Sequence, residues 1–331
     1  MGRKNKDSEP FALTNLALVL VGIFFCAIVY GIVSVLVTQS DSNDGKSRSD
    51  YQWKMDRSLW GTRSDQCCKG IDKLELWGKV VSFTRASSPE ECCNACKRNC
   101  SGWFGRCLCH AWVFCGHKKS CGTRYGECWL KEQKNVMFPE EHESGVHVMW
   151  TSGINFGKGE GMVGLKTTYG TIRIQLLSNC APLSVSIILD GMKLGYCERC
   201  YFYRAERRGD SWDEEGNHVE LKSYGPPYAL IQGVLNARGS LGNGTTENPR
   251  RLTRGSVAWI GAGPDFIISL ADHREWGTRY SVFATVLAED MWVAEKIANL
   301  PTKTQLWNGV EVSSLPKPIP FTIQRARVAS K

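Results

Sequence analysis

The sequence predicts a multidomain chain: a single transmembrane helix, a small disulfide-rich α+β module, and a mainly-β closed barrel with two capping helices. Three observations support this prediction. Residues 11–38 contain no charged side chain, eleven of the fifteen cysteines lie between Cys67 and Cys128, and the second half alternates short apolar strands with two helical stretches. The expected boundaries are a cytoplasmic tail at 1–10, a membrane span at 11–38, a stem at 39–64, a cysteine-rich module at 65–155 and a barrel domain at 156–331.

The apolar segment at 11–38 is longer than the roughly 20 residues that cross a bilayer core. Arg3, Lys4 and Lys6 precede it, and basic residues favour the cytoplasmic side. A cleavable signal peptide has a shorter apolar core and a small-residue cleavage site, which VLVTQSDSND lacks. We therefore expect an uncleaved signal anchor in a single-pass type II membrane protein of the secretory pathway (ER, Golgi or cell surface), with its bulk lumenal or extracellular.

Charge argues against a nucleic-acid partner. The 331 residues include 41 basic and 33 acidic side chains, for a net charge of +8, and the two signs are interspersed. A nucleic-acid-binding protein would show a basic stripe or a recognised module, and the sequence has neither. The stem contains the polar run DSNDGKSRSD, which is typical of a solvated segment.

The cysteines beyond the membrane span are expected to form disulfides. Fourteen of them lie on the oxidising side of the membrane, where cysteines pair, so up to seven bridges can form. Within this region SSPEECCNACKRNC predicts a short helix, with Ser88 as its N-cap, Pro89 in its first turn and two glutamates at its positive end. Zinc is the alternative, from the cysteines at 107–121 with His110 and His117. Their spacing matches no common zinc site, so we expect no metal and no cofactor.

Several motifs in this module resemble the PAN/apple family. They are SPEECCNAC, ECWLK at Glu127–Lys131 and MWTSG at Met149–Gly153, within a stretch of about residues 65–155. The resemblance implies a helix stapled by disulfides to a small antiparallel sheet, with a protein or a carbohydrate as ligand. This sequence has more cysteines than the family usually carries, so the resemblance leaves the pairing open.

The run INFGKGEGM at Ile154–Met162 has three glycines and no periodicity, and it marks the domain boundary. Beyond it, alternating apolar residues predict short strands, and the segments from Pro182 and Glu289 predict helices. Roughly eight short strands with two helices are typical of a closed barrel. The expected strands are Val163–Thr168, Thr171–Leu177, Tyr201–Ala205, Tyr228–Leu235, Ser256–Ile260, Phe266–Leu270, Tyr280–Leu287 and Phe321–Val328, and the expected helices are Pro182–Leu194 and Glu289–Leu300.

This half of the chain resembles the cyclophilin family of peptidyl-prolyl isomerases over about residues 160–328. The similar motifs are YGTIRIQL, FYRAE at Phe202–Glu206, LIQGVL at Leu230–Leu235, GSVAWIGAGPDFIISLA at Gly255–Ala271 and EWGTRYSVFATVLAEDMWVAEKIANL at Glu275–Leu300. The resemblance implies the isomerisation of X–Pro peptide bonds in proline-containing peptides or client proteins, without metal or nucleophile.

The resemblance also implies a set of site residues. Arg204 corresponds to the catalytic arginine, Gln232 to the glutamine that positions the substrate backbone, and Trp276 to the tryptophan at the pocket edge. The proline pocket itself is altered: Leu230 replaces a methionine, Ala229 falls on the first aromatic wall, Ile267 or its neighbour Phe266 on the second, and Tyr280 on a histidine. A large apolar side chain contributes about 1.5–3 kcal/mol when buried, and about 1.4 kcal/mol changes a rate tenfold, so we expect weak activity.

Alternatives remain open at several positions. The barrel could serve as a non-catalytic scaffold for peptides, proteins or glycans. A glycosyltransferase is suggested only by the type II layout, and no Asp-x-Asp motif occurs. Three interpretations of the polar insertion at 206–227 are open: it recruits a partner, it covers the substrate site, or it is a surface loop without a function of its own. Cys197 and Cys200 are expected to form a structural bridge, with each other or with Cys180, and Asn243 lies in a glycosylation sequon.

Overall fold

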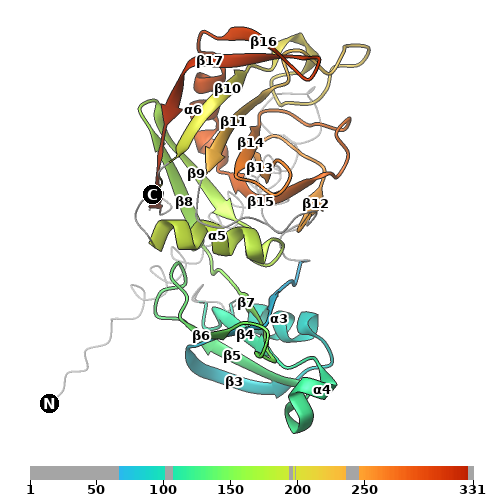
Figure 1. Cartoon of the computed structure of the whole chain (residues 1–331), viewed down its shortest axis with the longest axis vertical. Helices are drawn as coiled ribbons and strands as arrows, with labels where there is room; N and C mark the ends of the chain where they lie inside the picture. The colour runs from blue at the N-terminus through green and yellow to red at the C-terminus, as the bar shows by residue number, and fades with distance from the viewer. Residues whose placement is uncertain (1–66, 101–106, 194–196, 198, 236–245, 327–331) are drawn as a thin grey trace, which may run out of the picture. The chain divides into compact units, whose positions relative to one another are not determined.

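The computed structural model describes residues 67–100, 107–193, 197, 199–235 and 246–326 (Figure 1). The predicted tail, membrane span and stem lie outside these residues, as does Asn243. Among the helices that are described, none has both the length and the apolar character needed to cross a membrane.

The predicted cysteine-rich helix is confirmed as α3 (Pro89–Arg98). The Ser88 side chain accepts a hydrogen bond from the backbone N–H of Glu91, and the Glu91 carboxylate bonds the backbone N–H and the hydroxyl of Ser87. The two hydrogen bonds from Ser87 to the carboxylate, above all the one from its backbone N–H, lower the pKa of Glu91. Acidic residues occupy the first turn and basic residues the last, which suits the helix dipole.

Replacing Ser88 with alanine should lower the free energy of unfolding by about 1 kcal/mol, because it removes the oxygen that accepts a hydrogen bond from the Glu91 N–H at the start of α3. Urea denaturation under non-reducing conditions measures this change. Ser88→Asn keeps an acceptor at the same position and should remain close to the wild type. Equal losses in both variants would contradict a capping role.

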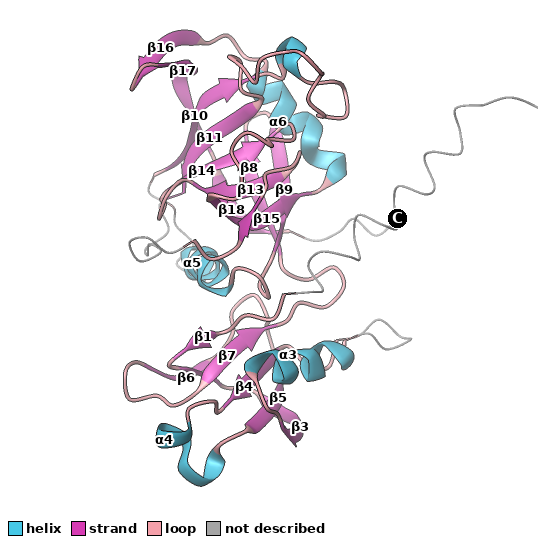
Figure 2. Cartoon of the chain, turned by 90° about the vertical axis from the view of Figure 1, so that its right-hand side faces the viewer, coloured by secondary structure: helices cyan, strands magenta, loops and turns pink. Residues whose placement is uncertain are grey.

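Helix α3 covers one face of a five-stranded antiparallel sheet (Figure 2). Trp112 and Phe114 lie on the face that forms a buried cluster with the cysteines of α3. A side chain added at Gly153 would lie 2.5 Å from the Trp112 ring, so this position accepts only glycine. The sheet order is β1 (Ile71–Asp72), β7 (Thr151–Ile154), β4 (Ala111–Phe114), β5 (Glu127–Glu132) and β3 (Lys79–Arg85); β2 (Leu74–Leu76) pairs with β6 (Glu141–Ser144), and α4 (Lys118–Cys121) and η1 (Gly122–Arg124) are single turns.

The fourteen described cysteines form seven disulfides, as the expected oxidising environment predicts. Cys197 pairs with Cys200, one of the two predicted alternatives, whereas Cys180 bridges to Cys67 at the start of the cysteine-rich region. The full set is Cys67–Cys180, Cys68–Cys93, Cys92–Cys128, Cys96–Cys109, Cys100–Cys107, Cys115–Cys121 and Cys197–Cys200.

The C-terminal half is a mainly-β domain built on one antiparallel sheet. In Figures 1 and 2, α5 (Pro182–Lys193) lies beside one end of this sheet and α6 (Met291–Ala298) nearer the other. The strands are β8 (Met162–Thr167), β9 (Gly170–Leu176), β10 (Cys200–Glu206), β11 (Leu230–Leu235), β12 (Pro249–Arg250), β13 (Ser256–Trp259), β14 (Asp265–Ser269), β15 (Tyr280–Val286), β16 (Lys303–Trp307), β17 (Val310–Pro320) and β18 (Thr322–Arg325), with single turns η2 (Gly209–Ser211) and η3 (Ala288–Asp290).

The prediction of a closed barrel is wrong for the described strands. Their hydrogen-bonded path runs β16-β17-β10-β11-β14-β13-β15-β9-β8-β18 and does not close, and β12 pairs with β15 outside this path. The reason lies at Phe321. Strand β17 pairs with β10 up to Pro320, and β18 then pairs with β8, so the covalent chain spans the gap that hydrogen bonds would otherwise close. The Phe321 ring enters the core, 4.9 Å from that of Phe202.

The hairpin of β16 and β17 was not predicted from the sequence. Asn308 and Gly309, both with positive φ, form its turn between strands that pair from Trp307–Val310 to Lys303–Ser314. An Asn-Gly pair flanked by alternating polar and apolar residues is a strong signal for a hairpin, and residues 303–312 show this pattern. The hairpin brings Trp307 to the candidate site.

Candidate active site

Arg204 and Gln232 lie directly opposite each other on the neighbouring strands β10 and β11. The Arg204 Nη1 donates a hydrogen bond of 3.2 Å to the Gln232 Oε1. A bulge between Phe202 and Arg204 shifts the register, so Phe202 lies fully buried in the core while the Arg204 side chain stays partly exposed. The two residues that the resemblance assigns to catalysis are therefore in direct contact.

A buried carboxylate holds the Arg204 guanidinium from the other side. The Glu206 side chain has no solvent exposure, and its Oε1 accepts a hydrogen bond of 2.7 Å from the Arg204 Nε. The same carboxylate accepts hydrogen bonds from the backbone N–H groups of Tyr228 (2.6 Å) and Ser313 (3.2 Å). Glu206 thus ties the arginine to the segment before β11 and to β17.

Gln232 is engaged at both ends of its amide. Its Nε2 donates to the Tyr203 hydroxyl, which in turn donates to Asp265 Oδ1 at 2.6 Å. Burial, followed by the bond to Asp265, raises the pKa of Tyr203, so its hydroxyl stays protonated at neutral pH. The chain of bonds from Arg204 to Asp265 fixes the orientation of Gln232.

Two aromatic rings flank the guanidinium. The Arg204 Cζ lies 5.6 Å from the ring centroid of Tyr228 and 5.7 Å from that of Trp307. Both distances are within the range of cation–π attraction. The guanidinium has five N–H donors, of which the described residues take up those on Nε and one on Nη1, so Nη2 is available to a ligand.

Ala229 does not contact this surface. It is fully buried within the core of the C-terminal sheet, with a φ of +49°. The ring next to Arg204 and Trp276 belongs instead to Tyr228, whose centroid lies 6.5 Å from that of Trp276. The sequence assigned this ring position to Ala229, one residue away from Tyr228. The left-handed backbone at Ala229 changes the direction in which the neighbouring side chains point.

The two candidates for the second aromatic wall separate in the same way. Phe266 packs in the core against Phe202, at a centroid distance of 5.7 Å. Ile267 instead joins a separate buried cluster that includes Leu230 and is covered by Tyr228, Trp276 and Tyr280. Ile267 and Leu230 therefore form the apolar layer beneath the three rings.

Trp276 and Tyr280 complete the aromatic surface, 5.8 Å apart. Burial raises the pKa of Tyr280, so its hydroxyl is also neutral at physiological pH. The Trp276 ring stacks on buried His273 at 3.7 Å, and the Trp212 ring, from the insertion at 206–227, lies 5.2 Å from His273 in an edge-on contact. This insertion packs Trp212, His218 and Tyr224 together, and it supports Trp276 through His273.

Besides Tyr228, four residues of the site were not predicted from the sequence, for different reasons. Tyr203 and Glu206 belong to the FYRAE motif, and alternation along β10 places Glu206 on the face of Arg204. Tyr203 reaches the same site only because of the bulge between Phe202 and Arg204, which alternation does not indicate. Trp307 could be placed at the site only once the hairpin of β16 and β17 was known. Asp265 carries no local pattern, because its role depends on the pairing of β11 with β14, which brings it beside Tyr203.

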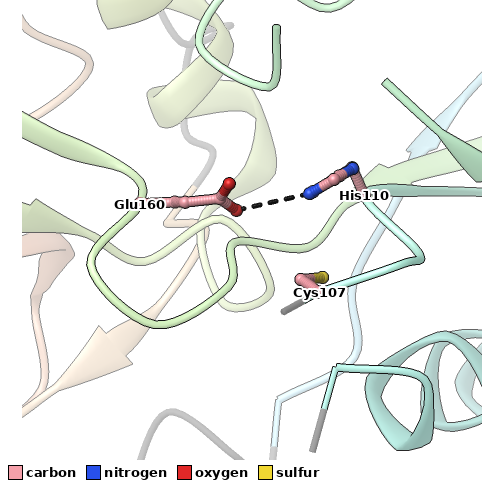
Figure 3. Close-up of side chains that lie close together, drawn as sticks. All are labelled: Cys107, His110 and Glu160. Carbon is pink, nitrogen blue, oxygen red and sulfur yellow. Dashed lines mark ion pairs between the residues drawn. The ribbon is translucent and has the colours of Figure 1, made fainter. Parts of the chain in front are cut away.

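A separate cluster joins Cys107, His110 and Glu160 (Figure 3). Their ligand-type atoms lie within 4.8 Å of one another, and the His110 Nε2 is 3.5 Å from the Glu160 Oε2. The hydrogen bond from His110 lowers the pKa of Glu160. The Cys107 sulfur is bonded to Cys100, so it is no thiolate, and the two remaining donors are too few for a structural zinc site.

Comparison with known proteins gives consistent matches for the C-terminal half. The sequence pattern of the family described as "cyclophilin type peptidyl-prolyl cis-trans isomerase/CLD" matches residues 162–317. A peptidyl-prolyl cis-trans isomerase of Acinetobacter baylyi is 30% identical over 153 residues, which is 43% of this chain and 74% of the relative.

Two crystal structures of a Cryptosporidium parvum cyclophilin type peptidyl-prolyl cis-trans isomerase were also matched, each 14% identical to this chain. One was determined in the presence of the dipeptide Ala-Pro; it has a TM-score of 0.36 and covers 51% of this chain and 99% of its own. The other has a TM-score of 0.35 and covers 50% of this chain and 98% of its own.

Proposed function

This chain belongs to the cyclophilin-type peptidyl-prolyl cis-trans isomerase family, and we propose that it binds proline-containing peptide segments at Arg204 and slowly isomerises their X–Pro bonds. The barrier to this reaction is about 18–20 kcal/mol, because the C–N bond has partial double-bond character. A catalyst must therefore favour the twisted amide over the planar one.

Arg204 is the residue suited to this task. Its guanidinium is already oriented by Glu206 and Gln232, so its free Nη2 can donate to the amide as it twists, without first reorganising. Leu230 and Ile267 offer an apolar floor for the proline ring, and Tyr228 and Trp276 offer walls. The contact of Arg204 with Gln232 at 3.2 Å is the single observation that carries the proposal.

We propose that the activity is weak because one aromatic wall is replaced by Ile267. An isoleucine side chain presents less surface to a proline ring than a phenyl group does. A loss of about 1.4 kcal/mol in transition-state binding already lowers the rate tenfold.

The test is an isomerisation assay on Xaa–Pro peptides with the full-length chain, purified in a mild detergent. We expect a rate above the uncatalysed background that is proportional to protein concentration. A rate equal to background at every protein concentration would remove the enzymatic proposal.

A non-catalytic peptide- or protein-binding scaffold is the second candidate. The engagement of both ends of the Gln232 amide favours it, because each of its polar atoms already makes one hydrogen bond within the protein, which leaves one N–H and one oxygen lone pair for a substrate backbone. Binding of proline-containing peptides without turnover would support the scaffold over the enzyme.

We also propose that residues 11–38 anchor the chain as a type II membrane protein of the secretory pathway. The seven disulfides suit an oxidising compartment. The same topology predicts glycosylation at Asn243. Enzymatic removal of N-glycans should lower the apparent mass of the wild type but not that of Asn243→Gln.

For the cysteine-rich region we propose a protein or carbohydrate ligand, as the PAN/apple resemblance implies. A cavity of about 850 Å³ supports this proposal; it is lined mainly by this region and includes Trp77, His110 and Gln133. Trp77 is 51% exposed, so it offers an aromatic surface to a ligand.

A further inference from the structure

We propose that the surface around Arg204 binds an extended, proline-rich segment with two prolines three residues apart. One proline would lie against Tyr228 and Trp276, and the other against Trp307 and Tyr203. The inference rests on the proposed peptide-binding function of this site, and it names the class of ligand.

The first observation is an unbroken series of pairwise contacts that joins six aromatic rings through Arg204. On one side, ring centroids of Tyr203 and Trp307 are 5.9 Å apart, and Tyr201 lies 6.2 Å from Tyr203. On the other side, Tyr228, Trp276 and Tyr280 follow at 6.5 and 5.8 Å. The guanidinium joins the two sets, because it contacts both Trp307 and Tyr228.

The second observation is that all six rings are partly exposed. An isolated exposed aromatic residue needs no explanation, but a contiguous set on one surface indicates a binding site. Two of the three polar atoms of the outer set have partners within the protein: the Tyr203 hydroxyl donates to Asp265 and the Trp307 indole N–H donates to Gln305. The ring faces are what this set offers to a ligand.

Aromatic surfaces of this kind suit polyproline II segments. Such a segment is extended before binding, so little conformational entropy is lost, and its prolines dock against aromatic side chains. Its backbone makes no internal hydrogen bonds, which leaves its carbonyl groups free to accept. Arg204, between the two ring sets, is positioned to donate to one of these carbonyls.

The two contacts of Arg204 set an upper limit on the separation of the Tyr228 and Trp307 rings, and hence on the spacing of the prolines. The Tyr228 and Trp307 centroids each lie less than 6 Å from the Arg204 Cζ. A polyproline II helix has three residues per turn and rises about 3.1 Å per residue, so prolines three apart lie on the same edge at about 9 Å. Two rings that share one guanidinium cannot be much farther apart than this repeat.

The experiment compares three labelled peptides by fluorescence anisotropy with the full-length chain in detergent. One has prolines three residues apart, one has them five apart, and one has the second proline replaced by alanine. We expect the first to bind about tenfold more tightly than the other two, as a second aromatic contact would provide.

Trp307→Ala should remove this tenfold preference, so that the variant binds the peptide with prolines three apart and the single-proline peptide equally well. Trp307→Leu keeps an apolar side chain in the hairpin and should lose the preference equally, which separates ring contact from hairpin folding. Trp292→Ala removes an exposed tryptophan from α6, away from the site, and should change nothing.

Equal affinity of the wild type for the one-proline and two-proline peptides would overturn the inference, as would equal weakening of both by Trp307→Ala. The proposed isomerase activity is tested separately. Turnover without a spacing preference would reject only the inference, and a spacing preference without turnover would reject only the enzyme.

Discussion

Replacing Arg204 with alanine should lower kcat/KM for an Xaa–Pro peptide by about 100-fold or more. The guanidinium is the one cation in contact with Gln232 among the described residues, and removal of a pre-oriented donor from a site of this kind typically costs 10²–10³ in rate. Because the wild-type activity is expected to be weak, single-turnover isomerisation at high protein concentration is the suitable measurement.

Two variants make this result interpretable. Arg204→Lys keeps the positive charge beside Glu206 but lacks the planar fork, so it should fold and still lose at least about tenfold in rate. Arg207→Ala removes an exposed arginine three positions along the chain from the core of the site and should retain full activity. Wild-type rates in Arg204→Lys would show that charge alone suffices, and wild-type rates in Arg204→Ala would reject the catalytic role.

Replacing Glu206 with alanine should destabilise the domain by about 3–5 kcal/mol, the usual range when one partner of a buried ion pair is removed. The variant leaves the Arg204 guanidinium without its anion and the N–H groups of Tyr228 and Ser313 without their acceptor. Chemical denaturation monitored by tryptophan fluorescence measures the loss.

Glu206→Gln preserves the shape and should lose less, about 1–3 kcal/mol, because one oxygen still accepts while the new amide N–H group faces a donor. Glu220→Ala, at an exposed position of the insertion, is the matched control and should stay within about 0.5 kcal/mol of the wild type. If Glu206→Ala were as stable as that control, the carboxylate would not hold the site together.

Local patterns in the sequence were sufficient for most elements. Ser88 and Pro89 located the start of α3, and the alternation in YGTIRIQL located β9, because capping and strand periodicity are properties of neighbouring residues. The resemblance assigned Arg204 and Gln232 to one site, and the pairing of β10 with β11, which was not predicted, places them opposite each other.

What could not be predicted depends on backbone geometry or on distant pairing. The positive φ at Ala229 accompanies a buried Ala229 and a Tyr228 ring beside Trp276, and no residue-type rule indicates a left-handed alanine. The partner of Cys180 is Cys67, a separation of 113 residues, which only the folded chain determines. The hairpin of β16 and β17 was not predicted, although the Asn308-Gly309 pair at its turn is a local signal.

The Cys67–Cys180 bridge makes a covalent ring of everything from residue 67 to residue 180. The glycine-rich run at 154–162 is consequently not the sole tether between the cysteine-rich region and the isomerase-like domain. Tension applied through the preceding residues would pass across the sulfur–sulfur bond directly to the start of α5 and bypass the whole cysteine-rich region. If residues 11–38 anchor the chain as proposed, a pull on the C-terminal domain would leave the disulfide-linked cysteine-rich region folded.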